Sequence, residues 1–217
     1  MNFELARFNM IEQQIRPWSV LDNAVLSLMA SVKRELFLPE ELRNLALSDT
    51  ELDIGQGEVM LSPKVQARLI AQLQLKATDD VLQIGAGTGF MTCVMAQLAQ
   101  SVLAYEIHPQ LAKAASANLE REHISNAKVV VGDASKNSTL DKKFDAIIFC
   151  GSLAQVPALW LEKLKPEGRL LAIVGEEPVM RTSVYTRMAD GSTTLVQPWD
   201  TCAPRLQHFA QAPSFVF

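Results

Sequence analysis

Three glycines at alternate positions form the clearest candidate binding site in this sequence. Gly85, Gly87 and Gly89 follow directly after an apolar run at residues 81–84. A strand that ends in such a turn brings backbone close to a ligand, and a helix that begins there offers unpaired N–H groups. The spacing is GxGxG, whereas the fingerprint of a dinucleotide site is GxGxxG. We therefore expect the loop to hold a nucleoside joined to an amino acid rather than a pyrophosphate.

Two acidic residues follow the next two predicted strands and extend this site. Glu106 comes after residues 102–105, and Asp133 comes after residues 128–131. Because parallel strands end at one edge of a sheet, both carboxylates should lie beside the glycine loop. Glu106 can accept hydrogen bonds from both hydroxyls of a ribose, and Asp133 is placed to meet the edge of an adenine ring. Either acid alone could instead cap a helix, but three adjoining strand ends together favour a nucleoside site.

The elements that must position these residues alternate between strand and helix. We predict strands at 81–84, 102–105, 128–131, 144–150 and 169–174, and helices at 92–99, 111–121 and 158–164. Short apolar strands that take turns with helices indicate an α/β fold, a doubly wound and mainly parallel sheet with helices on both faces.

The two ends of the chain have other patterns. Residues 3–48 are predicted to be mostly helical, and Ser62-Pro63 should open a further helix with Ser62 as its N-cap. Asp190-Gly191 between two strand-like runs predicts a C-terminal antiparallel hairpin, with residues 215–217 as a candidate last strand. We expect a single domain at 1–217, made of a helical region (1–78), a ligand-binding core (79–175) and a β region (176–217).

Composition narrows the classes of function. The 217 residues carry a formal net charge of −4, which argues against broad contact with a nucleic acid backbone. The three cysteines lack CxxC spacing and the three histidines are scattered, so no metal site is expected. No apolar run has the length of a membrane span and the N-terminus lacks the core of a signal peptide, so we expect a cytoplasmic protein without membrane association.

With these motifs in order, the chain resembles the protein-L-isoaspartate O-methyltransferase family over most of its length. Residues 32–39 (VKRELFLP) are similar to the family's VPRExFVP, 46–49 (ALSD) to its AYxD, and 54–57 (IGQG) to its IGxGQ. The glycine loop, Glu106, Gly132-Asp133 and residues 168–170 follow at matching positions. The N-terminal motifs are the specific ones, because general methyltransferases lack them.

The resemblance implies a Rossmann-like class I methyltransferase fold and the donor S-adenosylmethionine. It also implies transfer of the methyl group to the free α-carboxylate of isoaspartyl residues in damaged proteins. The positions that it assigns to the donor are Gln83, Gly85, Ala86, Gly87, Thr88 and Gly89 in the loop, Glu106 and Ile107 at the ribose, and Asp133 and Ala134 at the adenine.

Three positions depart from the family pattern. Gln83 stands where the family usually has an acid, and Val59 replaces a threonine. The family's active-site serine falls on Leu61 when the chain is aligned on Pro63, and Ser62 comes one residue later. We keep Leu61 and Ser62 as the candidate catalytic positions and interpret Ser62 first as a helix cap.

We expect these departures to affect the binding and orientation of the acceptor more than the binding of the donor. A carboxylate acceptor has an unperturbed pKa of about 3.5–4, so it is ionised at neutral pH and needs no general base. Transfer then depends on alignment and on the exclusion of water. Two alternatives therefore stay open beside isoaspartyl methylation: a methyltransferase for another acceptor, such as a small apolar molecule, and a non-catalytic S-adenosylmethionine-binding sensor or scaffold.

A few further residues offer chemistry for the acceptor. Arg16 offers a cation for a carboxylate, although an ion pair explains it more readily. Cys150 ends a predicted strand and should border the acceptor, but it has no evident histidine partner and is not predicted as a nucleophile. Arg34 and Glu35 are interpreted as a structural pair.

Overall fold

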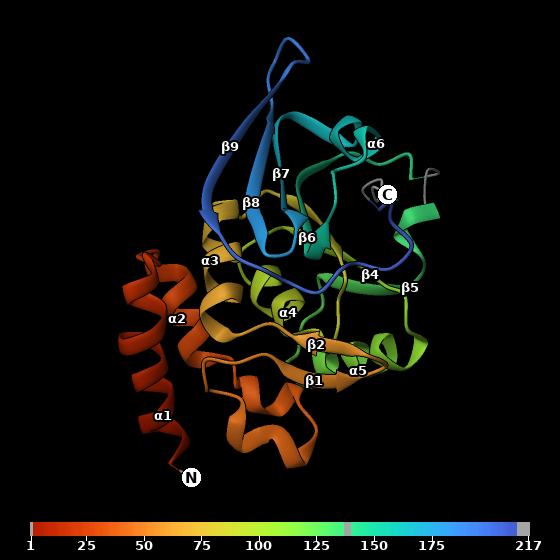
Figure 1. Cartoon of the computed structure of the whole chain (residues 1–217). Helices are drawn as coiled ribbons and strands as arrows, with labels where there is room; N and C mark the ends of the chain where they lie inside the picture. Colours follow the sequence, from red (N-terminus) through yellow and green to blue (C-terminus); the bar gives the residue numbers. More distant parts are fainter. Residues whose placement is uncertain (1, 137–139, 212–217) are drawn as a thin grey trace, which may run out of the picture.

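The computed structural model describes residues 2–136 and 140–211, and within them lies one seven-stranded sheet. The order of strands across it is β5 (Ala127–Val131), β4 (Ser101–Glu106), β3 (Asp80–Ile84), β6 (Phe144–Leu153), β7 (Leu164–Glu176), β8 (Val179–Arg187) and β9 (Thr193–Asp200). The first five strands in this order are mutually parallel, and β8 and β9 are antiparallel (Figure 1). The predicted α/β fold and the C-terminal hairpin are therefore confirmed.

The order of strands reverses between β3 and β6. From β3 the chain adds β4 and β5 on one side, then returns to place β6 on the other side of β3. The carboxyl ends of strands at such a switch point leave a crevice where doubly wound proteins bind ligands. Since the glycine loop follows β3, the topology places it at this crevice.

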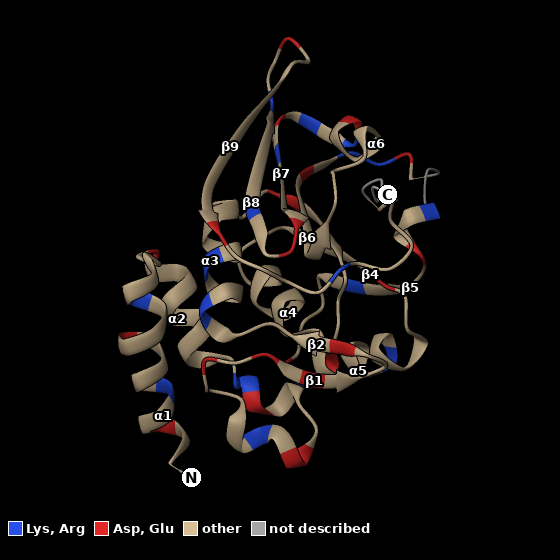
Figure 2. Ribbon diagram, in the orientation of Figure 1, with Lys and Arg blue, Asp and Glu red and all other residues tan. Residues whose placement is uncertain are grey.

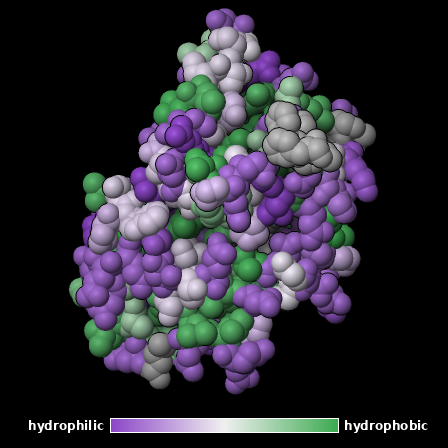
Figure 3. Space-filling view, viewed as in Figure 1, coloured by the Kyte–Doolittle hydropathy of each residue, from purple (hydrophilic) through white to green (hydrophobic). Residues whose placement is uncertain are grey.

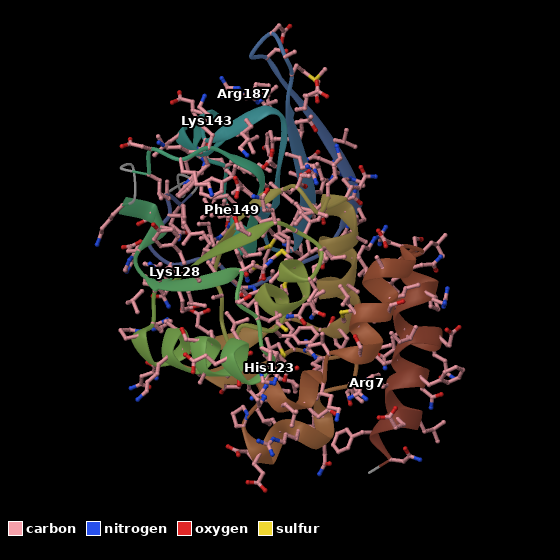
Figure 4. All side chains as sticks on the ribbon, turned by 180° about the vertical axis from the view of Figure 1, so that it is seen from behind. Arg7, His123, Lys128, Lys143, Phe149 and Arg187 are labelled. Carbon is pink, nitrogen blue, oxygen red and sulfur yellow. The ribbon has the colours of Figure 1, made fainter. Side chains whose placement is uncertain are left out.

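Two hydrophobic clusters lie on opposite faces of the sheet. One joins α2 (Asn23–Ser31), α3 (Pro63–Leu73), α4 (Phe90–Ala96) and α5 (Pro109–Arg121) to the sheet through residues such as Ile148. The other joins α6 (Ala158–Glu162) to residues such as Phe149. Phe149, labelled in Figure 4, packs edge-to-face on both Trp160 and Phe209. Ile148 and Phe149 are adjacent but serve opposite faces, as the alternation of a strand requires.

The N-terminal region is mostly helical, as predicted, but it is more broken than expected. It comprises α1 (Phe3–Asn9), a π-helix (Met10–Ile15), 3-10 segments (Arg16–Trp18, Arg34–Phe37 and Glu40–Leu45), α2 and, beyond a small hairpin, α3. That hairpin is formed by β1 (Leu52–Gly55) and β2 (Glu58–Met60). In Figure 1 it crosses in front of α5, below the main sheet.

Ser62 occupies the N-cap position of α3, but its side chain makes no capping hydrogen bond. The predicted N-cap position is therefore confirmed, but the side-chain hydrogen bond that serine usually contributes there is absent. Only the backbone carbonyl of Ser62 takes part, accepting from the N–H of Gln66 at 3.1 Å. Pro63 at the first helical position already has a helix-compatible φ, so the first turn forms without a side-chain cap.

The C-terminal strands are longer than predicted, and β9 is exposed. Both Leu195 and Val196 of β9 lie open on the surface, and Figure 3 shows apolar surface over this strand.

Elsewhere, acidic and basic residues are interspersed along the ribbon (Figure 2). In the described ranges no helix is long and apolar enough to cross a membrane. The candidate strand at 215–217 lies outside the described residues, and the division into regions at 78 and 175 stays a prediction.

Candidate donor and acceptor site

A cavity that is partly open to solvent lies at the carboxyl ends of β3, β4 and β6. Its wall includes all the predicted donor positions except one: Gln83, Gly85, Ala86, Gly87, Thr88, Glu106, Ile107, Asp133 and Ala134. The exception is Gly89, which begins α4 and packs against α5 instead.

The three glycines of the loop all have positive φ, at +87°, +54° and +86° in chain order. Such angles are disfavoured for side chains with a Cβ, so glycine is required for this turn. The N–H groups of Gly85 and Ala86 donate to the carbonyl of Tyr105 in β4, at 2.9 and 3.1 Å. The loop is thus tied to the strand that carries Glu106, and its geometry is set before any ligand binds.

Replacing Gly89 by alanine is expected to destabilise the fold more than replacing Gly191 by alanine. Both glycines have φ of +86°, so both alanines would carry the same backbone strain. A Cβ at Gly89 would lie 3.1 Å from Cα and Cβ of Ala115, whereas nothing lies within 4 Å of one at Gly191. Overpacking should make the free energy of unfolding lower by about 1–3 kcal/mol in Gly89→Ala than in Gly191→Ala, as measured by urea denaturation. Equal losses in the two variants would contradict this packing argument.

Glu106 is buried, and its carboxylate holds the glycine loop by a hydrogen bond. One oxygen accepts from the N–H of Gly87 at 2.7 Å, and the other accepts from the N–H of His108 at 3.0 Å. Burial raises the pKa of Glu106, and the two backbone hydrogen bonds oppose that rise. A carboxylate has about four acceptor sites, so each oxygen can still accept one hydroxyl from a ligand.

Asp133 is held by Ser135, which follows it closely in the chain, and by His208 of the C-terminal segment. One oxygen accepts from the backbone and hydroxyl of Ser135 at 3.0 and 2.6 Å, and the other lies 2.8 Å from Nδ1 of His208. Burial acts to raise the pKa of Asp133, but hydrogen bonds from Ser135, His208 and Lys136 outweigh it and lower the pKa to about 2. Asp133 is therefore a fixed anion at the wall of the cavity.

Gln83 is buried and fully engaged within the protein. Its Nε2 donates to the carbonyl of Gly85 at 3.1 Å, and its Oε1 accepts from the hydroxyl of Thr92 at 2.7 Å. Nε2 also lies 3.4 Å from Sγ of Cys150. An acid at this position could not donate to the Gly85 carbonyl, so the amide stabilises the loop in a way that the usual carboxylate does not.

Residues 204–209, here called the strap, close one side of the cavity. The sequence motifs did not predict that this segment would belong to the site. Its backbone pairs with Ser152 at the end of β6, through Ser152 N to the Pro204 carbonyl at 2.8 Å and Leu206 N to the Ser152 carbonyl at 3.0 Å. Figure 1 shows this segment running across the front of the molecule after β9. No periodic pattern or motif marks these residues, so the sequence offered no local signal for them.

The strap meets the β1–β2 hairpin at the mouth of the cavity. Nε2 of Gln207 donates to Oε1 of Glu58 at 2.8 Å, and the same oxygen lies 3.2 Å from Nε2 of His108. Three segments that are far apart in the sequence therefore share one hydrogen-bonded contact beside the ligand space.

One part of the cavity wall is apolar: Val59, Met60 and Leu61 line it, whereas Ser62 does not. Ser62 is buried at the start of α3, so its hydroxyl does not replace the family serine at the cavity wall. Cys150 lines the cavity as predicted, and burial raises the pKa of its thiol to about 12, which leaves it protonated and unreactive at neutral pH.

The backbone that carries Leu61 is held by a buried arginine. Arg34 donates from Nη2 to the Leu61 carbonyl at 2.8 Å, from Nε to the Ala46 carbonyl at 2.7 Å, and from Nη1 to Gln66. Burial lowers its pKa to about 9, so it remains charged at neutral pH. Arg34 thus fixes the junction between β2 and α3, where the apolar wall of the cavity is built.

Arg34 and Glu35 are structural, but they do not pair with each other. Glu35 binds the buried guanidinium of Arg7 at 2.5 Å, and Arg7 is labelled in Figure 4. Neighbouring residues on a helix face different directions, which is why their partners differ. Arg16 pairs with Glu12 at 2.8 Å and does not line the cavity, so its interpretation as an ion-pair partner is confirmed.

Comparisons with known proteins agree with this geometry. Residues 6–201 match the family model described as Protein-L-isoaspartate(D-aspartate) O-methyltransferase. A protein-L-isoaspartate O-methyltransferase of Petrotoga mobilis is 32% identical over 88% of this chain and 91% of its own length. Protein-L-isoaspartate O-methyltransferase 1 of Rhodopseudomonas palustris is 38% identical over 81% of this chain and 72% of its own length.

A solved structure shows the same fold over nearly the whole chain. It is a Plasmodium falciparum protein described as a beta-aspartate methyltransferase in complex with S-adenosyl-L-homocysteine. The TM-score is 0.78 at 21% identity, and the match covers 95% of this chain and 99% of that chain.

Proposed function

Because this chain belongs to the protein-L-isoaspartate(D-aspartate) O-methyltransferase family, we propose that it methylates the free carboxylate of isoaspartyl residues in proteins or peptides, with S-adenosylmethionine as donor. One observation carries the donor half of this proposal. The cavity joins the glycine loop, Glu106 and Asp133 at the carboxyl ends of three neighbouring strands. Doubly wound folds bind ligands at such a crevice, and the GxGxG spacing fits a nucleoside linked to an amino acid better than a pyrophosphate.

The residues present fit that donor. Positive φ angles keep side chains out of the loop, so a ligand can approach its backbone. Both oxygens of Glu106 retain acceptor capacity for ribose hydroxyls. The hydroxyl oxygen of Thr88 is buried without a partner among the described residues, which leaves a polar group for the ligand to satisfy.

We assign the donor's parts to the wall accordingly. The loop from Gly85 to Thr88 holds the amino-acid end, with Gln83 bracing it and Gly89 packing it on α5. Glu106 and Ile107 hold the ribose. Asp133 and Ala134 border the adenine.

The chain supplies position rather than acid–base chemistry. When bound, the donor presents a methyl group on a sulfonium, and an ionised carboxylate oxygen takes it as the C–S bond breaks and its electron pair stays on sulfur. No proton moves, so no general base is needed, and alignment and a water-poor site are what the protein must provide. The apolar residues Val59, Met60 and Leu61 exclude water on the acceptor side.

The proposal is tested by two measurements on the purified protein. Calorimetry should show binding of S-adenosylhomocysteine, and incubation with labelled S-adenosylmethionine should place a base-labile methyl ester on a peptide with an isoaspartyl residue. The same peptide with ordinary aspartate is the control. Donor binding without transfer to the isoaspartyl peptide would reject isoaspartyl methylation, and absence of donor binding would reject the assignment of the cavity.

A second candidate function follows from Leu61. Because a leucine lines the cavity where the family has its serine, an apolar acceptor would fit this wall better than an isoaspartyl peptide does. Leu61→Ser is expected to raise isoaspartyl transfer if that hydroxyl is what the site lacks, whereas Ser62→Ala should change nothing, since Ser62 does not line the cavity. A large loss of transfer in Ser62→Ala would instead show that Ser62 substitutes for the missing serine.

A further inference from the structure

The strap brings a cation to the wall of the cavity. Arg205 is the only lysine or arginine among the described residues that line the cavity. Its side chain is 20% exposed, so most of it is shielded from water. A mostly buried guanidinium beside a ligand cavity is costly to desolvate, which makes its hydrogen bonds informative.

Those hydrogen bonds leave part of the guanidinium free. Nη2 of Arg205 donates to the Gly175 carbonyl at 2.8 Å and lies 2.9 Å from Oε1 of Glu176. Nη1 is buried and has no hydrogen-bond partner in the described part of the chain. Since Glu176 is about half exposed, it neutralises the charge only partly. A planar guanidinium with one satisfied edge and one unsatisfied nitrogen is suited to a second carboxylate.

The topology places Arg205 on the β6 side of the glycine loop. Glu106 and Asp133 follow β4 and β5, on one side of the glycine loop. Arg205 pairs in an isolated bridge with Ser152 of β6 and reaches the end of β7, on the other side. The hydroxyl of Ser152 is also buried without a partner in these residues. Two unsatisfied polar groups therefore lie on paired segments at this end of the sheet, and of the two residues only Arg205 lines the cavity.

We propose that Arg205, as the cation of the cavity wall, recognises the carboxylate of the methyl acceptor, for which Leu61 offers no hydroxyl. This inference rests on the proposed carboxyl methylation and specifies how the acceptor is bound. Arg205 selects an ionised carboxylate over a neutral group of the same shape, while the apolar wall at Leu61 packs against the rest of the acceptor. The carboxylate can come from an isoaspartyl peptide or from a free small acid, since the guanidinium recognises the same group in both.

The test measures binding to the complex with S-adenosylhomocysteine, so it does not depend on turnover. One arm compares an isoaspartyl peptide with the same peptide in which the α-carboxylate is a carboxamide. The other arm compares hexanoate with hexanamide. The wild-type protein is expected to bind the acid about 10- to 100-fold more tightly than the amide in at least one arm, and Arg205→Gln should abolish this ratio.

Matched variants separate recognition from a structural role of the strap. Glu176→Gln removes the carboxylate beside Arg205 but leaves the guanidinium, so it should keep the preference for the acid. Arg205→Lys keeps the charge and should keep part of the preference. If Arg205→Gln also weakens S-adenosylhomocysteine binding, the acid-to-amide ratio still decides, because it compares two ligands on one protein.

Each outcome bears on one claim. A preference for the acid that persists in Arg205→Gln, or a wild-type protein that prefers the acid in neither arm, overturns the role of Arg205. A preference that depends on Arg205, in a protein that transfers no methyl group to the isoaspartyl peptide, leaves the inference standing and removes the proposed isoaspartyl activity. The arm that shows the preference identifies the source of the carboxylate.

Discussion

Replacing Arg34 by methionine is expected to lower the free energy of unfolding by about 3–6 kcal/mol. The guanidinium is fully buried and donates to the carbonyls of Ala46 and Leu61 and to the side chain of Gln66. It also lies 5.2 Å from the ring centre of Phe90. Methionine keeps much of the volume but leaves buried acceptors without donors, and each such group costs about 1–3 kcal/mol. Chemical denaturation followed by circular dichroism measures the loss.

Arg181→Met is the control for this change. Arg181 is exposed and lies 3.4 Å from the exposed Asp200, so its replacement should cost less than about 1 kcal/mol. If Arg34→Met were as stable as Arg181→Met, the buried carbonyls would have found other partners, and the role of Arg34 in holding the Leu61 backbone would be refuted. A folded Arg34→Met protein should also bind the acceptor more weakly, because the β2–α3 junction is released.

Replacing Glu106 by alanine is expected to raise the Kd for S-adenosylhomocysteine about 100-fold or more. The variant loses the carboxylate that holds the N–H groups of Gly87 and His108, and it loses the acceptors for the ribose. Hydrogen bonds to a charged group contribute about 1.5–3 kcal/mol each, and 1.4 kcal/mol corresponds to a factor of ten in Kd. Glu120→Ala, an exposed change on α5, is the control and should leave the Kd unchanged. Titration calorimetry with S-adenosylhomocysteine on both variants measures the two Kd values.

The pKa of Glu106 adds a second readout to that experiment. Burial raises this pKa in the folded protein, so the group takes up its proton at higher pH than in the unfolded chain. Its contribution to stability therefore increases as pH falls through the raised pKa, while its capacity to accept ribose hydroxyls decreases. Donor binding in the wild-type protein should weaken over this range before the fold is lost, and Glu106→Ala should not show that dependence.

The donor half of the site could be predicted from sequence because each of its parts has a local signal. Gly85, Gly87 and Gly89 mark a turn that only glycine adopts readily, and Glu106 and Asp133 each stand directly after an apolar strand. The position of each acid along its strand and the parallel order of the strands then place them together. These are short-range patterns, and the structure reproduces them with small shifts in the bounds of helices and strands.

The acceptor half depends on contacts between distant residues, which no local pattern reveals. Arg205 reaches the cavity because the strap pairs with Ser152, 53 positions earlier in the chain. Arg34 and Glu35 are adjacent, yet one binds Leu61 and the other binds Arg7. Ser62 was predicted as a helix N-cap from its type and its place before a proline, and it holds that position, but its side chain makes no capping hydrogen bond.

The strap also has a consequence for the timing of synthesis. The glycine loop and the strands that carry Glu106 and Asp133 are made before residue 140, but the wall at Pro204, Leu206 and Gln207 is made more than sixty residues later. A growing chain therefore carries the glycine loop, Glu106, Asp133 and the apolar wall at Leu61 before the strap has been made. Closure of the cavity on the strap side, and with it the full shielding of a bound donor from water, can begin only after these late residues have been added.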